Sequence, residues 1–241
     1  MVNKATFHFY EELNDFIASD KKRLAYIYSF YGNPSIKDAI EAIGVPHVEV
    51  NLMRVNGQVV DFAYHLKDND RVSVYPVPKT GKKASKVIKF ILDVHLGKLA
   101  KYLRMCGFDS AYQNDYDDKK IVLISLEENR IILTRDIGML KMKSVSQGYF
   151  IRNQDSKAQL MEVLQHFDLQ QAIDPFKRCI KCNGKLERVE KEKVMQRLQP
   201  LTQKHFNTFF KCENCQSIFW EGSHFDRMSG FINTIKNSEN P

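Results

Sequence analysis

Residues 87–136 of the 241-residue chain are VIKFILDVHLGKLAKYLRMCGFDSAYQNDYDDKKIVLISLEENRIILTRD. The apolar runs at 87–92 and 131–134 have the length and composition of buried strands. Between them, apolar residues recur at helical spacing, and Gly107 is a typical helix stop. Strands that alternate with helices in this way predict a parallel sheet with helices on both faces. The expected fold class is therefore α/β.

The same alternation extends to about residue 174. GYFI at 148–151 predicts another strand, and DSKAQLMEVLQHF at 155–167 predicts a final helix. Upstream, PVPKTGKKASK at 76–86 has the proline, glycine and lysine content of a linker. We therefore expect an N-terminal domain, a linker, the α/β domain and a cysteine-containing segment, at residues 1–78, 79–87, 88–174 and 175–241.

Three acids are expected at one edge of the sheet. Asp93 and Asp136 directly follow buried strands, and Asp118 opens the helix between them. In an open parallel sheet, ligands bind at the carboxyl ends of the strands. Gathered carboxylates repel one another unless a cation binds between them, and hard oxygen ligands suit magnesium or manganese. Such an ion orients water for attack on a phosphodiester.

Helix capping is an equally good explanation for any one of these acids, because aspartate is a favoured helix N-cap. Asp155, which opens the last helix of this region, is the weakest metal ligand by this criterion. Asp93 and Asp136 are the strongest, since each follows a buried strand.

The run from FILD through LGKLAKYLR, GFD and DDKK to ILTRD resembles the Mut-7 C-terminal RNase family, a branch of PIN-like nucleases. The resemblance spans about residues 88–230 and implies a PIN-like fold. It also implies that Asp93, Asp118 and Asp136 are the catalytic, metal-binding acids. Some related proteins have a further acid where this chain has Gly138, so a single metal ion is expected.

Three other residues of this region have predicted roles. Arg135 lies beside Asp136 and could contact an RNA phosphate or pair with the acids. Arg104 is expected to be structural. Cys106 lies on the apolar face of its helix, so we expect a packed core thiol.

Four cysteines form two CxxC pairs, Cys179/Cys182 and Cys212/Cys215, with 29 residues between the pairs. Two such turns close a tetrahedral site, so the pattern predicts one structural zinc ion in a zinc ribbon. The resemblance includes RCxxCN and the Trp220–His224 run WEGSH. Candidate RNA contacts are the basic Lys181 and Lys211, with Trp220 or Phe219 for stacking and His224 for a phosphate. Packing is the preferred role for Trp220, and a solvated face is an alternative for the lysines.

The N-terminal segment predicts strand, strand, helix, strand and strand, with a turn at Asn56-Gly57. This order is similar to a β-grasp, ubiquitin-like fold. Sulfur carriers of that fold need a free diglycine C-terminus, whereas this chain continues through PVPKTGKK. A docking role toward a protein partner is therefore the expectation.

The net charge of +7 is concentrated in residues 176–241, which carry 12 Lys and Arg against 7 Asp and Glu. This balance suits a nucleic-acid partner, with transfer and ribosomal RNA as candidates. We expect no membrane segment and no signal peptide, hence a cytoplasmic protein, or a nuclear one in a eukaryote. The leading hypothesis is a metal-dependent ribonuclease acting on structured RNA. The alternatives are a non-catalytic RNA-binding protein and a protein-docking adaptor.

Overall fold

The computed structural model describes residues 2–78, 88–222, 230 and 232. The chain divides into two compact units, Met1–Pro78 with Thr134–Phe150, and Lys79–Leu133 with Ile151–Pro241. The predicted linker at 79–87 lies outside the described residues. Within the described part of the chain, no helix is both long and apolar enough to cross a membrane.

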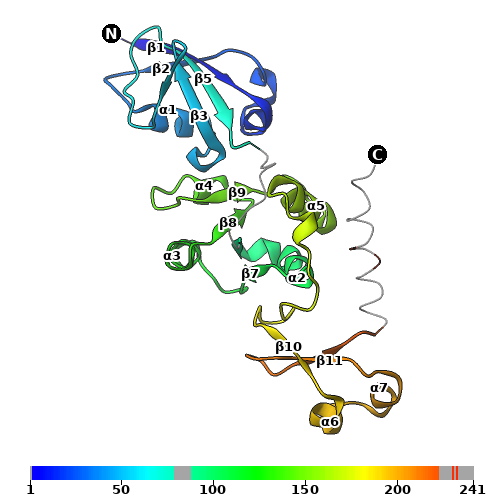
Figure 1. Cartoon of the computed structure of the whole chain (residues 1–241). Coiled ribbons are helices and arrows are strands. Elements are labelled where there is room, and N and C mark those ends of the chain that lie inside the picture. Colours follow the sequence, from blue (N-terminus) through cyan, green and yellow to red (C-terminus); the bar gives the residue numbers. More distant parts are fainter. Residues whose placement is uncertain (1, 79–87, 223–229, 231, 233–241) are drawn as a thin grey trace. The chain divides into compact units, whose positions relative to one another are not determined.

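The N-terminal part is a five-stranded sheet with one α-helix packed against it (Figure 1). The strand order is β2-β1-β5-β3-β4, in which β1 and β5 are parallel and the other neighbours are antiparallel. The alternation of β1 places Ala5, Phe7 and Phe9 in the core. The strands are β1 (Asn3–Phe9), β2 (Tyr26–Phe30), β3 (Val50–Val55), β4 (Gln58–Val60) and β5 (Arg71–Pro76). This is the predicted β-grasp arrangement.

Helix α1 (Ile36–Ile43) begins and ends as its sequence predicts. Ser35 caps it by accepting a hydrogen bond from the Asp38 amide at 3.1 Å. Gly44 ends it at φ 137°, where an added Cβ would lie 2.9 Å from the Phe16 carbonyl oxygen, so only glycine fits. Short 3-10 turns that the sequence analysis did not predict complete this part: η1 (Glu11–Phe16), η2 (Ser19–Lys21) and η3 (His47–Glu49).

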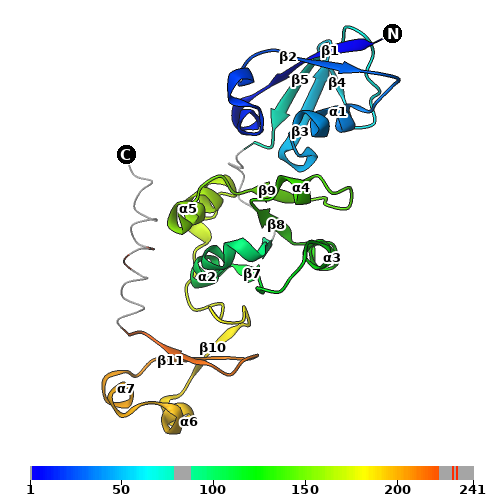
Figure 2. The same cartoon turned by 180° about the vertical axis from the view of Figure 1, so that it is seen from behind.

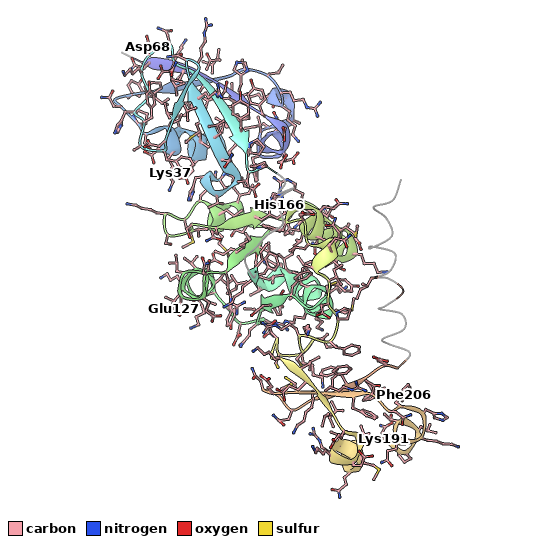
Figure 3. The ribbon with its side chains drawn as sticks, in the orientation of Figure 1. Lys37, Asp68, Glu127, His166, Lys191 and Phe206 are labelled. Carbon is pink, nitrogen blue, oxygen red and sulfur yellow. The ribbon has the colours of Figure 1, made fainter. Side chains whose placement is uncertain are left out.

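The predicted α/β region forms a four-stranded sheet of order β7-β6-β8-β9. Strand β6 is parallel to both β7 and β8, and Leu92 pairs with Leu133 at the carboxyl end. Helices α2 and α5 pack side by side, as both views show (Figures 1 and 2). Glu127 of α3 is exposed on the side away from the core (Figure 3). The elements are β6 (Lys89–Leu92), η4 (Val94–Leu96), α2 (Gly97–Met105), β7 (Asp109–Ala111), α3 (Asp118–Glu128), β8 (Ile131–Thr134), α4 (Ile137–Leu140), β9 (Gly148–Phe150), α5 (Ser156–His166) and η5 (Gln170–Ala172).

The C-terminal part is a three-stranded antiparallel sheet, β10-β11-β12, with short helices in the interval between the CxxC pairs. Val194 and Leu198 from the helical insert pack on Phe209 of the sheet and form a small core. This insert accounts for the long spacing between the cysteine pairs. The elements are β10 (Leu186–Val189), α6 (Lys191–Val194), η6 (Met195–Arg197), α7 (Pro200–His205), β11 (Phe209–Cys212) and β12 (Ile218–Trp220).

Candidate active site and zinc centre

Asp93 lies at the carboxyl end of β6 and is only 5% exposed. Its backbone amide donates to the Leu133 carbonyl oxygen at 3.1 Å, which continues the β6–β8 pairing by one residue. Its side chain caps η4 by accepting a hydrogen bond from the His95 amide at 3.3 Å. The carboxylate is therefore held in one orientation at the strand end.

Asp136 follows β8 and is exposed. Its amide donates to Thr134 Oγ1 at 2.9 Å, and its Oδ1 accepts from the Gly138 amide at 2.7 Å, which caps α4. A Cβ at position 138 would lie 3.0 Å from that Oδ1, so a side chain there would press on the carboxylate. Gly138 thus allows the tight turn in which Asp136 is presented.

Asp118 is the first residue of α3 rather than its cap. Asp117 is the N-cap and accepts from the Lys120 amide at 2.7 Å. Capping also holds for Asp155, whose Oδ1 accepts from the Lys157 and Ala158 amides, both at 3.0 Å. Of Asp93, Asp118, Asp136 and Asp155, only Asp118 does not cap a helix, and it is exposed.

Asp93 and Asp118 belong to the second compact unit, and Asp136 belongs to the first. Within the part of the chain that the structure describes, the group of potential metal ligands whose atoms all lie within 4.8 Å of one another is the cysteine quartet. The paired ends of β6 and β8 bring the backbone at Asp93 and Leu133 together. The assignment of Asp93, Asp118 and Asp136 as catalytic metal ligands remains a prediction.

The four cysteines gather as predicted. Cys179 and Cys215 sulfurs are 3.6 Å apart, and those of Cys182 and Cys212 are 3.4 Å apart. These separations are close to the roughly 3.8 Å between sulfurs of a tetrahedral zinc site with Zn–S bonds of about 2.3 Å. Four sulfurs at this spacing fit one zinc ion and leave no open position.

The thiols differ in their pKa values. Burial raises the pKa of Cys179 to about 12, although the Cys182 and Lys181 amides oppose this. Burial also acts on Cys215, but hydrogen bonds with Ser217, Cys182 and Cys179 together outweigh it and lower the pKa to about 6. A bound cation favours thiolates, so zinc would shift the whole quartet toward the deprotonated form.

Asp109 joins the first CxxC turn to the α/β domain. Its Oδ1 accepts from Asn183 Nδ2 at 2.7 Å, and its Oδ2 pairs with Arg178 at 2.8 Å. Asn183 Oδ1 in turn accepts from the Ser110 amide at 2.9 Å. No local pattern predicts this network, although its residues occupy the Gly-x-Asp and RCxxCN motifs. Those motifs therefore have a structural role in attaching the zinc turn to β7.

Two buried arginines complete the attachment. Arg104 is 3% exposed and donates to the carbonyls of Ser110, Tyr112, Ile180 and Lys181 at 2.9 to 3.3 Å. Arg130 pairs with Asp109 at 2.6 Å and donates to the Phe90 carbonyl at 3.1 Å. The structural role predicted for Arg104 is confirmed. Cys106 is fully buried, as expected for a core thiol.

The predicted RNA contacts vary in exposure. Lys181 is exposed, whereas Lys211 and Arg135 are half-buried. Trp220 is 37% exposed, and its ring centre lies 6.3 Å from that of Phe206. Trp220 pairs with Phe209, while Phe219 pairs with Phe210, so Trp220 and Phe219 face opposite sides of the sheet. His224 lies outside the described residues.

Two protein-family models match the chain, one in its N-terminal part and one in the remainder. The Mut7-C RNAse domain matches residues 88–232, and the Mut7-C ubiquitin domain matches residues 2–81. The chain belongs to the Mut7-C RNase domain family. The two Mut7-C domains occur in the order expected from the sequence, with the ubiquitin-like domain first.

No curated protein matches the chain. Among solved structures, a protein from Pyrococcus furiosus named as a molybdopterin converting factor, subunit 1, is similar at 21% identity with a TM-score of 0.25. The match covers 31% of this chain and 97% of that one. A similarity at this level supports no argument about function.

Proposed function

We propose that this Mut7-C protein is a metal-dependent ribonuclease that hydrolyses phosphodiester bonds of a structured RNA. The observation that supports it most is the Mut7-C RNAse domain match over residues 88–232. The carboxylates that follow β6 and β8 add the chemistry that such a domain needs. The RNA candidates are transfer and ribosomal RNA.

Asp93, Asp118 and Asp136 would hold a magnesium or manganese ion. Carboxylate oxygens are the ligands that these hard ions prefer. Magnesium is usually held by one or two carboxylates together with water and substrate phosphates. The ion would stabilise charge on the phosphate and activate the attacking water.

The chain's own residues bind and orient the RNA. Arg135 adjoins Asp136 and would neutralise a phosphate next to the scissile bond. Lys181, Lys211, Trp220 and His224 would contact the RNA from the basic zinc ribbon. The zinc ion itself would have no part in the reaction, because its four sulfur ligands leave no open position.

The deciding test is cleavage of labelled total RNA with magnesium, manganese or EDTA, comparing wild type with Asp136→Asn. Asparagine also caps helices well, so the substitution keeps the turn while removing the negative charge. Asp155→Asn is the matched control, because Asp155 caps α5 in the same way. We expect metal-dependent cleavage that falls by at least about 100-fold in Asp136→Asn and is unchanged in Asp155→Asn.

A second candidate is a non-catalytic RNA-binding protein. It is favoured by the capping hydrogen bonds of Asp93 and Asp136, which give both acids a structural role. Salt-sensitive RNA binding without cleavage, unchanged in Asp136→Asn, would establish this function and rule out the ribonuclease.

A further inference from the structure

One face of the ubiquitin-like domain binds a segment of the same compact unit, the α4–β9 segment (Ile137–Phe150). This face is formed by the C-terminal half of α1, by η3 and by Phe16 at the end of η1. Its polar contacts are made by Glu41, His47 and Glu49. All the contacts lie inside the first compact unit.

His47 bridges the two sides of this contact. Its Nδ1 lies 2.6 Å from Glu41 Oε1, and its Nε2 lies 2.9 Å from the Val145 carbonyl oxygen. The ring is packed edge-on against Phe62, at 6.1 Å between ring centres. Both ring nitrogens face oxygen atoms, so the side chain is fixed at both ends.

Three further contacts hold the segment, one near its start and two at its end. Lys141 Nζ donates to the Glu41 carbonyl oxygen at 2.7 Å. At the other end, Glu49, which is 4% exposed, accepts from the Phe150 amide at 2.6 Å. The Phe150 ring packs against Phe16, with ring centres 5.3 Å apart. A buried carboxylate bound to a backbone amide is a strong, directional contact.

The contact between Lys141 and Glu41 lies one short helix away from Asp136. Lys141 is the C-cap residue of α4, and Asp136 is its N-cap. The four residues of the helix rise only about 6 Å, at 1.5 Å each. With its C-terminal end held by the ubiquitin-like domain, the helix has little freedom to move Asp136.

We propose that the ubiquitin-like domain is a positioning element for the ribonuclease site, acting through Lys141 and His47 on the helix that Asp136 caps. This proposal rests on the ribonuclease function proposed above. Lys141 and His47 are positioning residues, since neither is assigned a contact with the RNA or the metal. It also follows that this face is occupied by the chain itself, so a protein partner would dock elsewhere on the domain.

The test uses the full-length protein with Lys141→Met, which keeps the aliphatic stem and removes the donor. Lys143→Met is the matched control, because Lys143 is exposed and lies in the same segment. His47→Leu is a second, independent disruption. Two quantities are measured: RNA cleavage kinetics, and amide hydrogen exchange of peptides covering residues 137–150.

We expect Lys141→Met and His47→Leu to lower kcat by about 10- to 100-fold, because small misplacements of a catalytic group have effects of this size. KM should stay within about twofold, since the RNA-contacting residues are untouched. Exchange should rise in residues 137–150 and stay unchanged in α5. Lys141→Arg should recover part of kcat, and Lys143→Met should match wild type.

Unchanged kcat and unchanged exchange in both disrupting variants would overturn the proposal. So would an equal loss in Lys143→Met, because charge alone would then explain the effect. If wild type shows no metal-dependent cleavage, the ribonuclease function fails, and with it the catalytic consequence. The exchange measurement would still decide whether the ubiquitin-like domain orders the α4–β9 segment.

Discussion

Asp109 shows how one carboxylate stabilises two parts of the chain. It is buried and is shared by Arg130, Arg178 and Asn183. Burial alone would raise its pKa, but the hydrogen bonds from Arg130 and Asn183 outweigh burial and hold the pKa below its usual value. Its charged form is therefore favoured by folding.

We expect Asp109→Asn to lower the free energy of unfolding by about 3 kcal/mol, because it leaves the buried Arg130 charge with only the exposed Glu128 as an acidic partner. Urea unfolding followed by fluorescence measures this, since Trp220 is the single tryptophan and lies in the same compact unit. The exposed Asp115→Asn is the control and should change stability by less than about 0.5 kcal/mol. A similarly small effect of Asp109→Asn would show that the network is dispensable.

The lowered pKa of Asp109 predicts that the free energy of unfolding depends on pH. A depressed pKa stabilises the fold above the unfolded value of about 3.9, and this contribution is lost as the pH falls through the lower folded pKa. The stability difference between wild type and Asp109→Asn should therefore be full at pH 6 and shrink below about pH 4. A difference that stays constant down to pH 3 would contradict the role of the charge.

At the scale of elements, the first CxxC turn couples the zinc ribbon to β7. Arg104 donates to the carbonyls of Ile180 and Lys181 inside this turn, and Asn183 follows it. Zinc would hold the same turn through Cys179 and Cys182. Loss of the ion should therefore loosen both the ribbon and the end of β7.

We expect wild type to carry one zinc ion per chain and Cys212→Ser to lose it, with faster hydrogen exchange at Asp109–Ala111. Structural zinc sites contribute on the order of 10 kcal/mol of binding free energy, so Tm should fall markedly. Zinc content by elemental analysis and exchange by mass spectrometry measure both effects. Cys106→Ala is the control, because it removes a buried thiol outside the quartet and should keep the zinc.

For the whole molecule, the distribution of charge predicts that the C-terminal part makes most of the RNA contacts. Residues 176–241 carry 12 Lys and Arg against 7 Asp and Glu, whereas residues 88–175 carry 12 against 12. A protein that neutralises phosphates releases counterions, so its affinity for RNA falls as salt rises.

Substitution of Lys181 and Lys211 by Gln should weaken RNA binding and reduce the slope of log affinity against log salt by about 1 to 2. Fluorescence anisotropy over a range of salt concentrations measures this slope. Lys67→Gln, an exposed lysine of the ubiquitin-like domain, is the control. An unchanged slope in the double variant would remove these lysines from the RNA interface.

Much of the architecture follows from local patterns. The strands that end before Asp93 and near Asp136 are short apolar runs, and α1 has a complete amphipathic period with Ser35 and Gly44 at its ends. The cysteine spacing also predicts the quartet. Helix α4 and the insert helices α6 and α7 were not predicted, because four to six residues contain too little of a helical period.

Sequence patterns therefore determined the strands, the longer helices, the four-cysteine cluster and the family, since each depends on short runs and motifs along the chain. Only the folded structure decided which motif residues meet. Asp109 and Asn183 are 74 residues apart, and Glu41 and Lys141 are 100 apart. Such contacts form only when distant segments pack together, and no local period or spacing encodes them.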